Sequence, residues 1–508
     1  MIYEYKTRPY AHQKKANELA WGREAFAFLM EMGTGKTKVM IDEAGLLFCD
    51  GKIDCALFLA PKGVYMNWVN NELPTHLSDS TNAAVAPWIS GGGNKKQSHQ
   101  LMTLLEGRNG LRICVMNTEA LSSGTKAINY ATAFLRSGRG YMGVDESTFI
   151  KNHSSNRTKS VWKLGQLAEY RRIATGSPVT RSPIDLYAQF HFLGSGLLGP
   201  AAYHPFRARY AILQQKDFGG RRVLVEVGYQ NLDQLTENLK HHSYRVTKDE
   251  CLDLPPKVYT TRNVDLTIEQ IRMYDEMKRN AQIMLTEGDS VSATAVIVQI
   301  LRLHQIVCGH LNTDDGEKIT VPSNRVTALR DVVSEVNGKV IIWARYRFDI
   351  EQIVRCLRHD YGENSVAEFH GGNTKTRQND ADRFLNDPEC RFMVSNQQSG
   401  GYGNTWVVAN TVIYYSNDYD LEKRLQSEDR AHRSGQTKSV TYVDLVAKGT
   451  VDEKILDALK RKINFMNMTS DAIEALSENE LKEALAGRGI DITQYQDKKA
   501  LVNKALML

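Results

Sequence analysis

Residues 33–37 read Gly-Thr-Gly-Lys-Thr, after an apolar run at 25–30 and before a helical pattern. Glycines leave backbone N–H groups free to approach an anion, and the start of a helix favours negative charge. Lys36 is expected to reach the outer phosphates of a nucleoside triphosphate, and Thr37 to hold Mg²⁺ through its hydroxyl. The loop departs from the full motif at Met30, where Gly or Ala is usual. The predicted cofactor-binding residues of this loop are Gly33, Thr34, Gly35, Lys36 and Thr37.

Two adjacent carboxylates, Asp145 and Glu146, end an apolar run that begins at Tyr141. Successive strand residues point to opposite faces, so the pair can divide its work. Asp145 is expected to hold Mg²⁺, and Glu146 to position and activate the attacking water, because phosphoryl transfer depends mostly on placement and charge neutralisation. A bare Asp-Glu is more often a solvated turn, but this one follows an apolar strand about a hundred residues after the glycine loop.

Arg430 and Arg433 are three residues apart, a spacing that predicts one face of a helix. An arginine brought to the γ-phosphate from another domain stabilises transition-state charge, worth about 10³–10⁵ in rate where it has been measured. For an isolated Arg-x-x-Arg, an exposed helix with surface ion pairs is the alternative.

The elements that must position these residues follow from the pattern of the 508-residue chain, whose length suggests roughly three domains. Short β-rich runs alternate with helical patterns in two stretches, which predicts parallel sheets of βαβ units with binding groups at the carboxyl ends of the strands. Between about 194 and 324 the alternation breaks, and helical patterns surround an extended segment at 255–264. The predicted strands are 25–30, 56–60, 111–116, 140–145 and 171–175, then 339–344, 365–369, 391–395, 411–416 and 440–446.

Composition describes a soluble globular protein with 42% hydrophobic and 24% charged residues. The formal charge is +5, so a nucleic-acid partner would need basic residues gathered on one surface. The seven cysteines show no Cys-x-x-Cys spacing, which argues against a disulfide framework or a zinc site. Without an N-terminal apolar core or a long apolar run, we expect a cytoplasmic protein (nucleoid or host cytoplasm), or a nuclear one if the source is eukaryotic, and no membrane contact.

In its motifs the chain resembles the superfamily-two helicase-like ATPases of the Swi/Snf type, in order over residues 8–465. Ala-Thr-Gly-Ser-Pro at 174–178 is similar to the element that links ATP state to domain movement. Tyr-Arg-Val-Thr-Lys at 244–248 and Leu-Pro-Pro-Lys at 254–257 resemble a stretch peculiar to this family. Residues 426–436 are similar to the arginine-finger motif nearly letter for letter.

The resemblance implies a set of site residues. Gln13 would read the adenine edge. Leu-Ala-Pro-Lys at 59–62, with Trp68 six residues further on, resembles the segment that touches the DNA backbone. The implied catalytic residues are Lys36, Glu146, Gln426, Arg430 and Arg433. The implied DNA-binding residues are Lys62, Asn117, Thr118, His370, Gly371, Ser399 and Gly400. Further basic candidates, each more often plain surface charge, are Lys151, Arg157, Lys159, Arg245 and Lys248.

Four positions depart from the family pattern. The usual Asp-Glu-Ala-His reads Asp-Glu-Ser-Thr at 145–148, which leaves open how hydrolysis is coupled to motion. Thr34 and Thr405 stand where leucine is customary, and Thr180 where asparagine is expected. The long insertions of the large remodellers are missing from the sequence, which favours a compact bacterial or phage member.

The expected fold class is α/β, with two RecA-like parallel-sheet lobes, a helical insertion region and a small all-α tail. The N-terminal ATP-binding lobe is expected at 1–230, a family-specific helical region at 231–323, the C-terminal lobe at 324–467, and the tail at 468–508. The tail resembles the helix–extension–helix modules of the SAP and LEM groups, with helices expected at 478–486 and 498–506. DNA binding and a docking or structural role are both open for it.

The resemblance implies an ATP- and Mg²⁺-using, DNA-dependent ATPase that couples hydrolysis to translocation on double-stranded DNA. Such an enzyme would remodel protein–DNA complexes or branched DNA, and its partners would be duplex DNA and other DNA-bound proteins. We expect a monomer. A strand-separating helicase and a catalytically silent DNA-binding scaffold are the alternatives.

Overall fold

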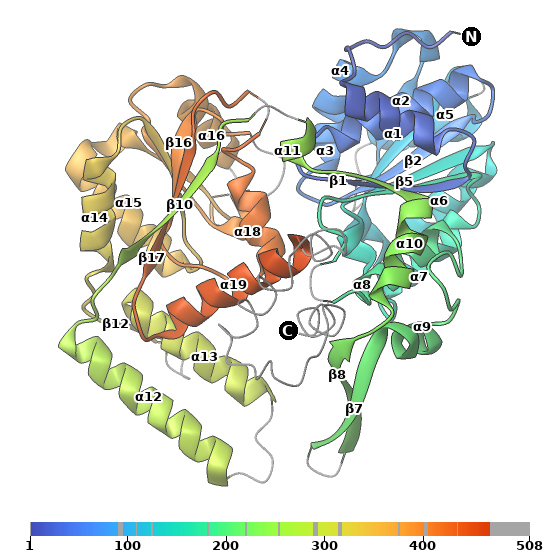
Figure 1. The fold of residues 1–508 in the computed structure, drawn as a ribbon. Helices are drawn as coiled ribbons and strands as arrows, with labels where there is room; N and C mark the ends of the chain where they lie inside the picture. Colours follow the sequence, from blue (N-terminus) through green and yellow to red (C-terminus); the bar gives the residue numbers. More distant parts are fainter. Residues whose placement is uncertain are drawn as a thin grey trace. The chain divides into compact units, whose positions relative to one another are not determined.

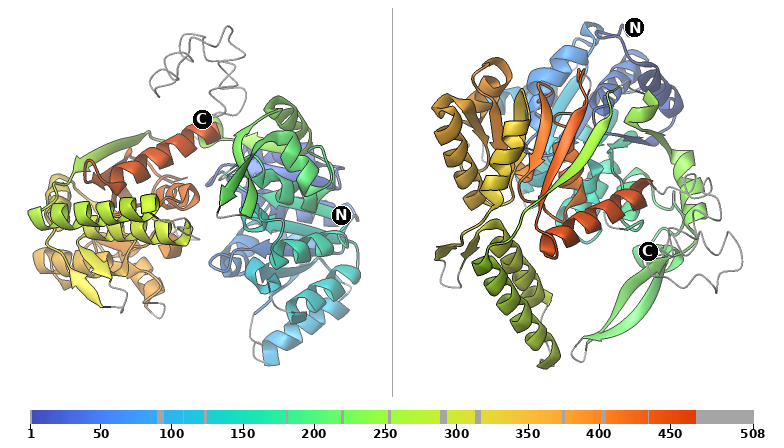
Figure 2. Two further views of the ribbon diagram at one scale, coloured as in Figure 1. Left: turned by 90° about the horizontal axis from the view of Figure 1, so that it is seen from below. Right: turned by 60° about the vertical axis from the view of Figure 1, so that its left-hand side comes forward.

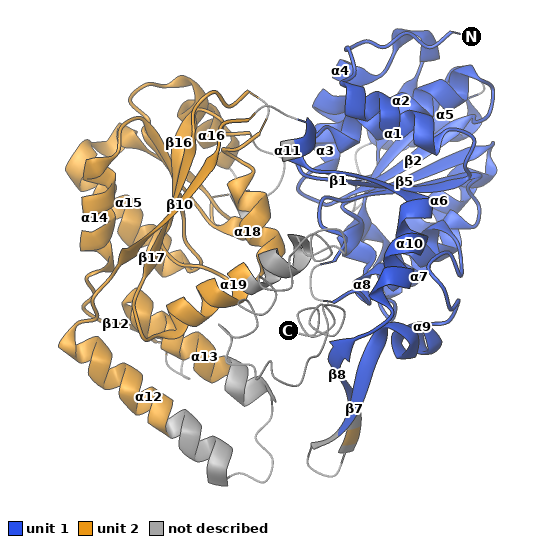
Figure 3. Ribbon diagram, viewed as in Figure 1, with its two compact units in different colours: residues 1–215, 224–252, 464–508 blue, residues 216–223, 253–463 orange. Residues whose placement is uncertain are grey.

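A computed structural model describes residues 2–89, 95–107, 109–122, 125–179, 182–218, 221–251, 254–287, 293–312, 317–373, 376–400, 405–433 and 435–467. The chain divides into two compact units (Figure 3). The first holds residues 1–215, 224–252 and 464–508, and the second holds 216–223 and 253–463. The tail helices expected at 478–486 and 498–506 lie outside the described residues, and the bounds of the four domains stay predictions.

The first unit is built on a seven-stranded parallel sheet in the order β3-β4-β2-β5-β6-β1-β9 (Figure 1). Its strands read as nearly continuous apolar runs, as expected where helices cover both faces. Their bounds are β1 Ala25–Met30, β2 Cys55–Ala60, β3 Ala84–Pro87, β4 Arg112–Asn117, β5 Gly140–Asp145, β6 Tyr170–Ala174 and β9 Ser243–Val246.

Alternate residues of β1 enter two separate cores. Ala27 and Leu29 pack with helices α6–α8, while Phe26, Phe28 and Met30 pack with α1 and α2. The sheet is therefore the middle layer of three. The helices of this unit are α1 Ala11–Ala20, α2 Lys36–Cys49, α3 Tyr65–Asn67, α4 Leu73–His76, α5 Lys95–Glu106, α6 Thr125–Arg136, α7 Asn156–Gly165, α8 Asp185–Leu193, α9 Tyr203–Tyr210, α10 Leu232–His242 and α11 Lys248–Cys251.

The second unit repeats this plan with a six-stranded parallel sheet in the order β10-β17-β16-β13-β15-β14. Ile341 and Trp343 of β13 face one core, and Val340 and Ile342 face the other. The strands are β10 Lys257–Asn263, β13 Lys339–Trp343, β14 Val366–Phe369, β15 Phe392–Ser395, β16 Ala409–Tyr414 and β17 Val440–Val446. The helices are α12 Ile268–Glu287, α13 Ala293–Cys308, α14 Arg325–Glu335, α15 Arg347–Tyr361, α16 Arg377–Asn386, α17 Gln397–Gly400, α18 Leu421–Glu428 and α19 Val451–Asn467.

All ten predicted strands are present, so the expected class of two parallel-sheet, RecA-like lobes is confirmed. The range 231–323 contributes more than helices, because β9 joins the first sheet and β10 the second. A short antiparallel pair, β11 His310–Asn312 and β12 Lys318–Thr320, follows α13.

A two-stranded sheet was not predicted from the sequence. Strands β7 Ala211–Phe218 and β8 Arg221–Tyr229 pair only with each other within the described residues, as a long hairpin (Figure 2). Residues 211–215 and 224–229 of this hairpin belong to the first unit. Among the described helices, none is long and apolar enough to cross a membrane.

Candidate active site

The glycine loop leaves β1 at Met30 and enters α2 at Lys36. Gly33 and Gly35 have φ angles of 81° and 84°, a region that glycine adopts without steric cost. Gly35 is the N-cap of α2, so the unpaired N–H groups of the first helical turn come directly after the loop. The loop predicted to bind phosphate thus has the backbone that an anion site needs.

Gln13 packs on this loop from α1. Its Nε2 donates to the Thr34 carbonyl at 3.1 Å, and its Oε1 accepts from the Tyr10 N–H at 3.0 Å. A Cβ placed on Gly35 would lie 2.1 Å from the same Nε2. The primary amide retains a second donor hydrogen and a second lone pair, so adenine recognition by Gln13 stays a prediction compatible with this packing.

Lys36 and the two carboxylates lie together at the carboxyl edge of the first sheet. The Nζ of Lys36 is 3.7 Å from Oε1 of Glu146, and both side chains are largely buried. Asp145 is the last residue of β5, and Thr37 lies in the first turn of α2. The structure therefore brings the predicted phosphate lysine next to the predicted water-activating carboxylate.

Asp145 is held by a residue that the sequence analysis assigned to a different role. The indole Nε1–H of Trp68 donates to Oδ2 of Asp145 at 3.0 Å, and Trp68 is fully buried against Phe58. Trp68 thus orients the carboxylate, and its ring is not available to touch DNA.

Burial and the charge of Glu146 raise the pKa of Asp145 to about 7, although Lys36 partly offsets them. A cation at this carboxylate would relieve that cost. Mg²⁺ is usually held by one or two carboxylates together with substrate phosphates, so the single Asp145 carboxylate and the Thr37 hydroxyl fit the ion.

Glu146 adopts a backbone conformation that is unusual for a residue with a side chain. Its φ is 50° and its ψ is 63°, in the left-handed region, which costs on the order of 1–3 kcal/mol. The Glu146 N–H donates to Oδ1 of Asp145 at 3.0 Å, and the Thr175 hydroxyl lies 3.4 Å from Oε2 of Glu146. Such strain persists where neighbouring contacts enforce it, and it is typical of functional sites.

The segment after β6 approaches the glycine loop closely. A Cβ on Gly176 would lie 2.9 Å from the backbone nitrogen of Met32, so only glycine fits there. Thr175 and Gly176 therefore connect the Glu146 turn with the phosphate loop, at the element that the resemblance links to domain movement.

Strand β9 also contacts the loop, through Glu31. The Glu31 N–H donates to the Val246 carbonyl at 2.9 Å, and Oε2 of Glu31 accepts from the Lys248 N–H at 2.8 Å. Lys248, one of the further basic candidates for DNA contact, is only 2% exposed. The family-specific stretch at 244–248 thus supports the glycine loop in this structure.

In the second unit, the helix expected to carry the arginines ends earlier than predicted. Helix α18 stops at Glu428, and Arg430 and Arg433 lie in the turns that follow, so the expectation of one helical face is wrong. The hydroxyl of Tyr442 donates to the Glu428 carbonyl at 3.0 Å, and the Trp406 N–H donates to the Arg430 carbonyl at 2.8 Å. These contacts hold the turns after α18, in which the His432 N–H still donates to the Glu428 carbonyl at 3.2 Å.

The two arginines differ in their surroundings. Arg430 is 7% exposed, and its Nε donates to the Gln426 carbonyl at 3.1 Å. Arg433 is more open, with one guanidinium nitrogen 2.8 Å from the Thr405 hydroxyl. Gln426 itself is fully buried. Arg433 is therefore the better placed of the two to reach a ligand outside its own unit.

The Leu-Pro-Pro-Lys stretch positions the arginine segment. The Nζ of Lys257 is 3.1 Å from Oε2 of Glu428, and the Tyr259 hydroxyl donates to the same oxygen at 2.7 Å. The ring of His432 contacts the Pro255 carbonyl at 2.7 Å. Although burial opposes ionisation, Lys257 and Arg424 hold the pKa of Glu428 at about 2. The buried carboxylate of α18 is thus anchored as an anion.

The predicted DNA contacts of the first unit differ in exposure. Lys62 is exposed, and its N–H donates to Oε2 of Glu119 at 3.1 Å. Asn117 and Thr118 are 4% and 0% exposed, and Oδ1 of Asn117 caps the Ala120 N–H at 2.8 Å. Lys62 is available at the surface, whereas the side chains of Asn117 and Thr118 face the interior.

In the second unit, His370 is 8% exposed, and its Nε2 lies 3.2 Å from Oε2 of Glu368. Gly371 is exposed, and Ser399 and Gly400 belong to α17. DNA contact at all of these positions stays a prediction.

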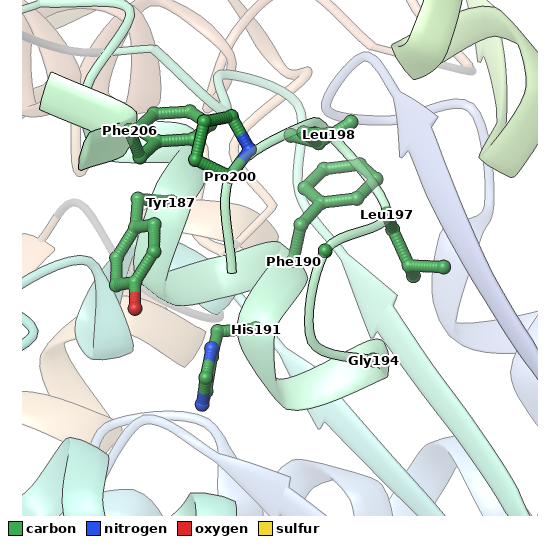
Figure 4. Close-up of a pocket in the computed structure, with 9 residues that line it drawn as sticks. Tyr187, Phe190, His191, Gly194, Leu197, Leu198, Pro200 and Phe206 are labelled. Carbon is green, nitrogen blue, oxygen red and sulfur yellow. The ribbon is translucent and has the colours of Figure 1, made fainter. Parts of the chain in front are cut away.

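A small pocket lies apart from the glycine loop, where α8 ends and the chain turns toward α9 (Figure 4). Its walls are mostly apolar, with Phe190, Leu198 and Phe206 among them, and burial lowers the pKa of the His191 imidazole at its edge. It has no phosphate-binding backbone, so it is not the nucleotide site.

The glycine loop, its lysine and the strand-end carboxylates define a P-loop ATPase, built on two RecA-like sheets. Residues 12–312 match the SNF2-related domain, and residues 324–435 match the helicase conserved C-terminal domain. The chain therefore belongs to the SNF2-related family of helicase-like ATP hydrolases.

Among its relatives is an uncharacterized ATP-dependent helicase of Mycoplasma genitalium, 24% identical over 86% of this chain and 40% of that protein. The putative ATP-dependent helicase/translocase YwqA of Bacillus subtilis is 25% identical over 89% of this chain and 48% of its own length. The DNA repair and recombination protein RAD54-like of Homo sapiens is 25% identical over 89% of this chain and 65% of its own length. This chain thus spans less than half the length of each of the two bacterial relatives.

A solved structure of the SWI2/SNF2 ATPase core of Sulfolobus solfataricus, in complex with double-stranded DNA, aligns over 95% of this chain and 97% of that chain. It is 23% identical, with a TM-score of 0.41.

Proposed function

We propose that this chain couples ATP hydrolysis to translocation along double-stranded DNA, and that it remodels protein–DNA complexes or branched DNA. The observation that carries the proposal is the meeting of Lys36 and Glu146, 3.7 Å apart, beside Asp145 in an SNF2-related chain. The choice of DNA as the polymer follows the name of the RAD54-like relative, a DNA repair and recombination protein.

In the proposed reaction, Lys36 faces the β- and γ-phosphates and neutralises their charge. Mg²⁺, held by Thr37 and Asp145, would supply further neutralisation of the phosphate oxygens. Glu146 accepts a hydrogen bond from the attacking water and fixes its direction toward the γ-phosphorus. The Thr175 hydroxyl near Oε2 of Glu146 restricts the orientation of that carboxylate.

The second unit supplies the arginine. Arg433, with Arg430 behind it, stabilises the charge of the transferring phosphoryl group when the two units close on the nucleotide. Hydrolysis would then occur only in the closed form, and this dependence is how ATP use becomes movement.

Displacement of a third DNA strand from a triplex tests translocation without strand separation. With ATP, we expect the wild-type chain to displace the third strand and Lys36→Ala to leave it bound. Displacement that proceeds equally well without ATP, or in Lys36→Ala, would contradict the proposal.

The hairpin β7–β8 favours a second candidate, a strand-separating helicase. It exposes Arg222, and it leaves Leu224 and Val227 at 51% and 45% exposed, as a wedge between base pairs requires. A forked duplex run beside the triplex separates the two functions. Fork unwinding that is lost in Leu224→Asp, while ATP turnover persists, would favour the helicase.

A further inference from the structure

Two fully buried polar side chains, those of Ser147 and Gln189, form a hydrogen bond at the turn that carries Glu146. The hydroxyl of Ser147 donates to Oε1 of Gln189 at 2.7 Å, and both residues are 0% exposed. Ser147 stands in the Asp-Glu-Ser-Thr box, next to Thr148, where the family has its histidine.

Gln189 extends this contact to the segment after β6. Its Nε2 donates to the Pro178 carbonyl at 2.7 Å and to the Asp185 carbonyl at 2.9 Å. Gln189 lies in α8 between apolar residues such as Leu186 and Phe190, where a buried amide is costly unless every polar atom is paired. Its hydrogen bonds satisfy both amide hydrogens and the oxygen. The buried amide therefore links Ser147 to the segment after β6 without leaving a polar atom unpaired.

A second connection joins the Glu146 turn to the segment after β6, through the Glu146 carboxylate itself. The Thr175 hydroxyl lies 3.4 Å from Oε2 of Glu146 and accepts from the Ser177 N–H at 3.2 Å. The Glu146 turn is therefore tied to the 175–178 segment twice, once through the catalytic carboxylate and once through Ser147 and Gln189.

We propose that Ser147 and Gln189 are positioning residues that couple the Glu146 turn to the Thr175–Pro178 segment, in place of the family's histidine. This inference rests on the proposed role of Glu146. Without the Ser147–Gln189 link, the left-handed turn relaxes, and Glu146 loses its alignment with the attacking water. The phosphate contacts of the glycine loop are not altered, so the loss falls on the chemical step and not on nucleotide binding.

The test compares Ser147→Ala, Gln189→Met and the double variant with a control, Ser160→Ala, whose hydroxyl donates to the Asn156 carbonyl within α7 at an exposed contact. A displacement of about 1 Å can cost about 10²-fold in rate. We expect kcat for ATP to fall about 10- to 100-fold in both single variants. KM and nucleotide affinity should stay close to wild type, and the double variant should be no worse than the more impaired single one.

Gln189→Glu separates the two halves of the link, because it keeps the acceptor for Ser147 and removes the amide hydrogens that Gln189 donates to the Pro178 and Asp185 carbonyls. We expect it to be as impaired as Gln189→Met. Ser147→Ala removes only one oxygen atom, so it carries the test if a Gln189 variant fails to fold.

Unchanged kcat in Ser147→Ala, or losses that multiply in the double variant, would overturn the inference. Glu146→Gln is measured beside these variants. If it retains full turnover, the proposed role of Glu146 fails; if it is inactive while Ser147→Ala is normal, only the present inference fails.

Discussion

Lys36, Asp145 and Glu146 place one cation beside two carboxylates in a largely buried site. Burial and the neighbouring Glu146 raise the pKa of Asp145 to about 7, so the site carries an excess of negative charge that burial makes costly. A magnesium–triphosphate complex would bring the cation that this carboxylate lacks and the anion that Lys36 and the loop favour. The charges of these three residues therefore favour the binding of a magnesium–nucleotide complex.

A buried carboxyl in the second unit gives a prediction for pH dependence. Burial raises the pKa of Asp349 from 3.8 to about 7, although Ser416 donates to its Oδ2. Between these values the unfolded chain loses the proton and the folded chain keeps it, so folding stability falls as pH rises. Asp349→Asn cannot ionise, so its stability relative to wild type should rise from pH 4 to pH 7, by at most about 4 kcal/mol.

Thermal unfolding midpoints measured from pH 4 to pH 8 would show this, with Asp331→Asn on the exposed side of α14 as the control. A difference between Asp349→Asn and wild type that does not change with pH would contradict the assignment.

The sequence predicted the groups that we propose to touch the nucleotide, and it missed the residues that hold those groups in place. Lys36 and Thr37 are recognisable because they are contiguous with their glycines. Trp68 and Gln189 support Asp145 and Ser147 from other elements, and such contacts appear only after folding. The expected helical face of Arg430 and Arg433 was wrong, because α18 ends at Glu428 and the chain continues in turns that Tyr442 and Trp406 contact.

The two ends of α2 provide a matched comparison of glycines. Gly35 and Gly51 have φ angles of 84° and 69°, so alanine at either position costs about 1–2 kcal/mol. A Cβ at Gly51 meets nothing within 4 Å, whereas at Gly35 it meets Gln13 at 2.1 Å. We expect both substitutions to lower thermal stability, and Gly35→Ala to lower it more, because its Cβ also displaces Gln13.

Only Gly35→Ala should also weaken ATP binding, because it displaces Gln13 and the loop. Equal nucleotide affinity in the two variants, measured by fluorescence titration, would contradict this role of the loop.

The anchor of α18 gives a third prediction. Lys257→Met removes the ammonium group that faces the buried Glu428, and a lost hydrogen bond to a charged group costs about 1–3 kcal/mol. The arginine segment should then be less well placed, and kcat for ATP should fall while nucleotide affinity stays unchanged. Lys423→Met is the control, because Lys423 lies on α18 at a position more exposed than that of Glu428. Equal turnover in both variants would count against the anchoring role of Lys257.

The buried parallel strands were predictable from the sequence, because apolar runs such as β5 and β17 are stable in water only when they are buried. The hairpin β7–β8 was missed, because its sequence is mixed in character and some of its described apolar residues, such as Leu224 and Val227, are open to solvent. Strand β9 was hidden in a stretch of helical pattern, since its pairing with β1 is a tertiary contact.

The proposed reaction uses residues of both units. Arg433→Ala should reduce ATP turnover by about 10³-fold or more, the range found for arginine fingers, while nucleotide affinity remains largely intact. Arg347→Ala, at an exposed site on α15, is the control within the same unit. A parallel loss of affinity and turnover in Arg433→Ala would show that the arginine has a different role.

In the proposed function, duplex DNA switches on ATP hydrolysis at the Lys36 site. The decisive measurement is steady-state ATP turnover without nucleic acid, and with single-stranded DNA, duplex DNA and duplex RNA. We predict low turnover without nucleic acid, the largest increase with duplex DNA, and no turnover in Lys36→Ala under any condition. Turnover that is the same with and without DNA, or that survives in Lys36→Ala, would contradict it.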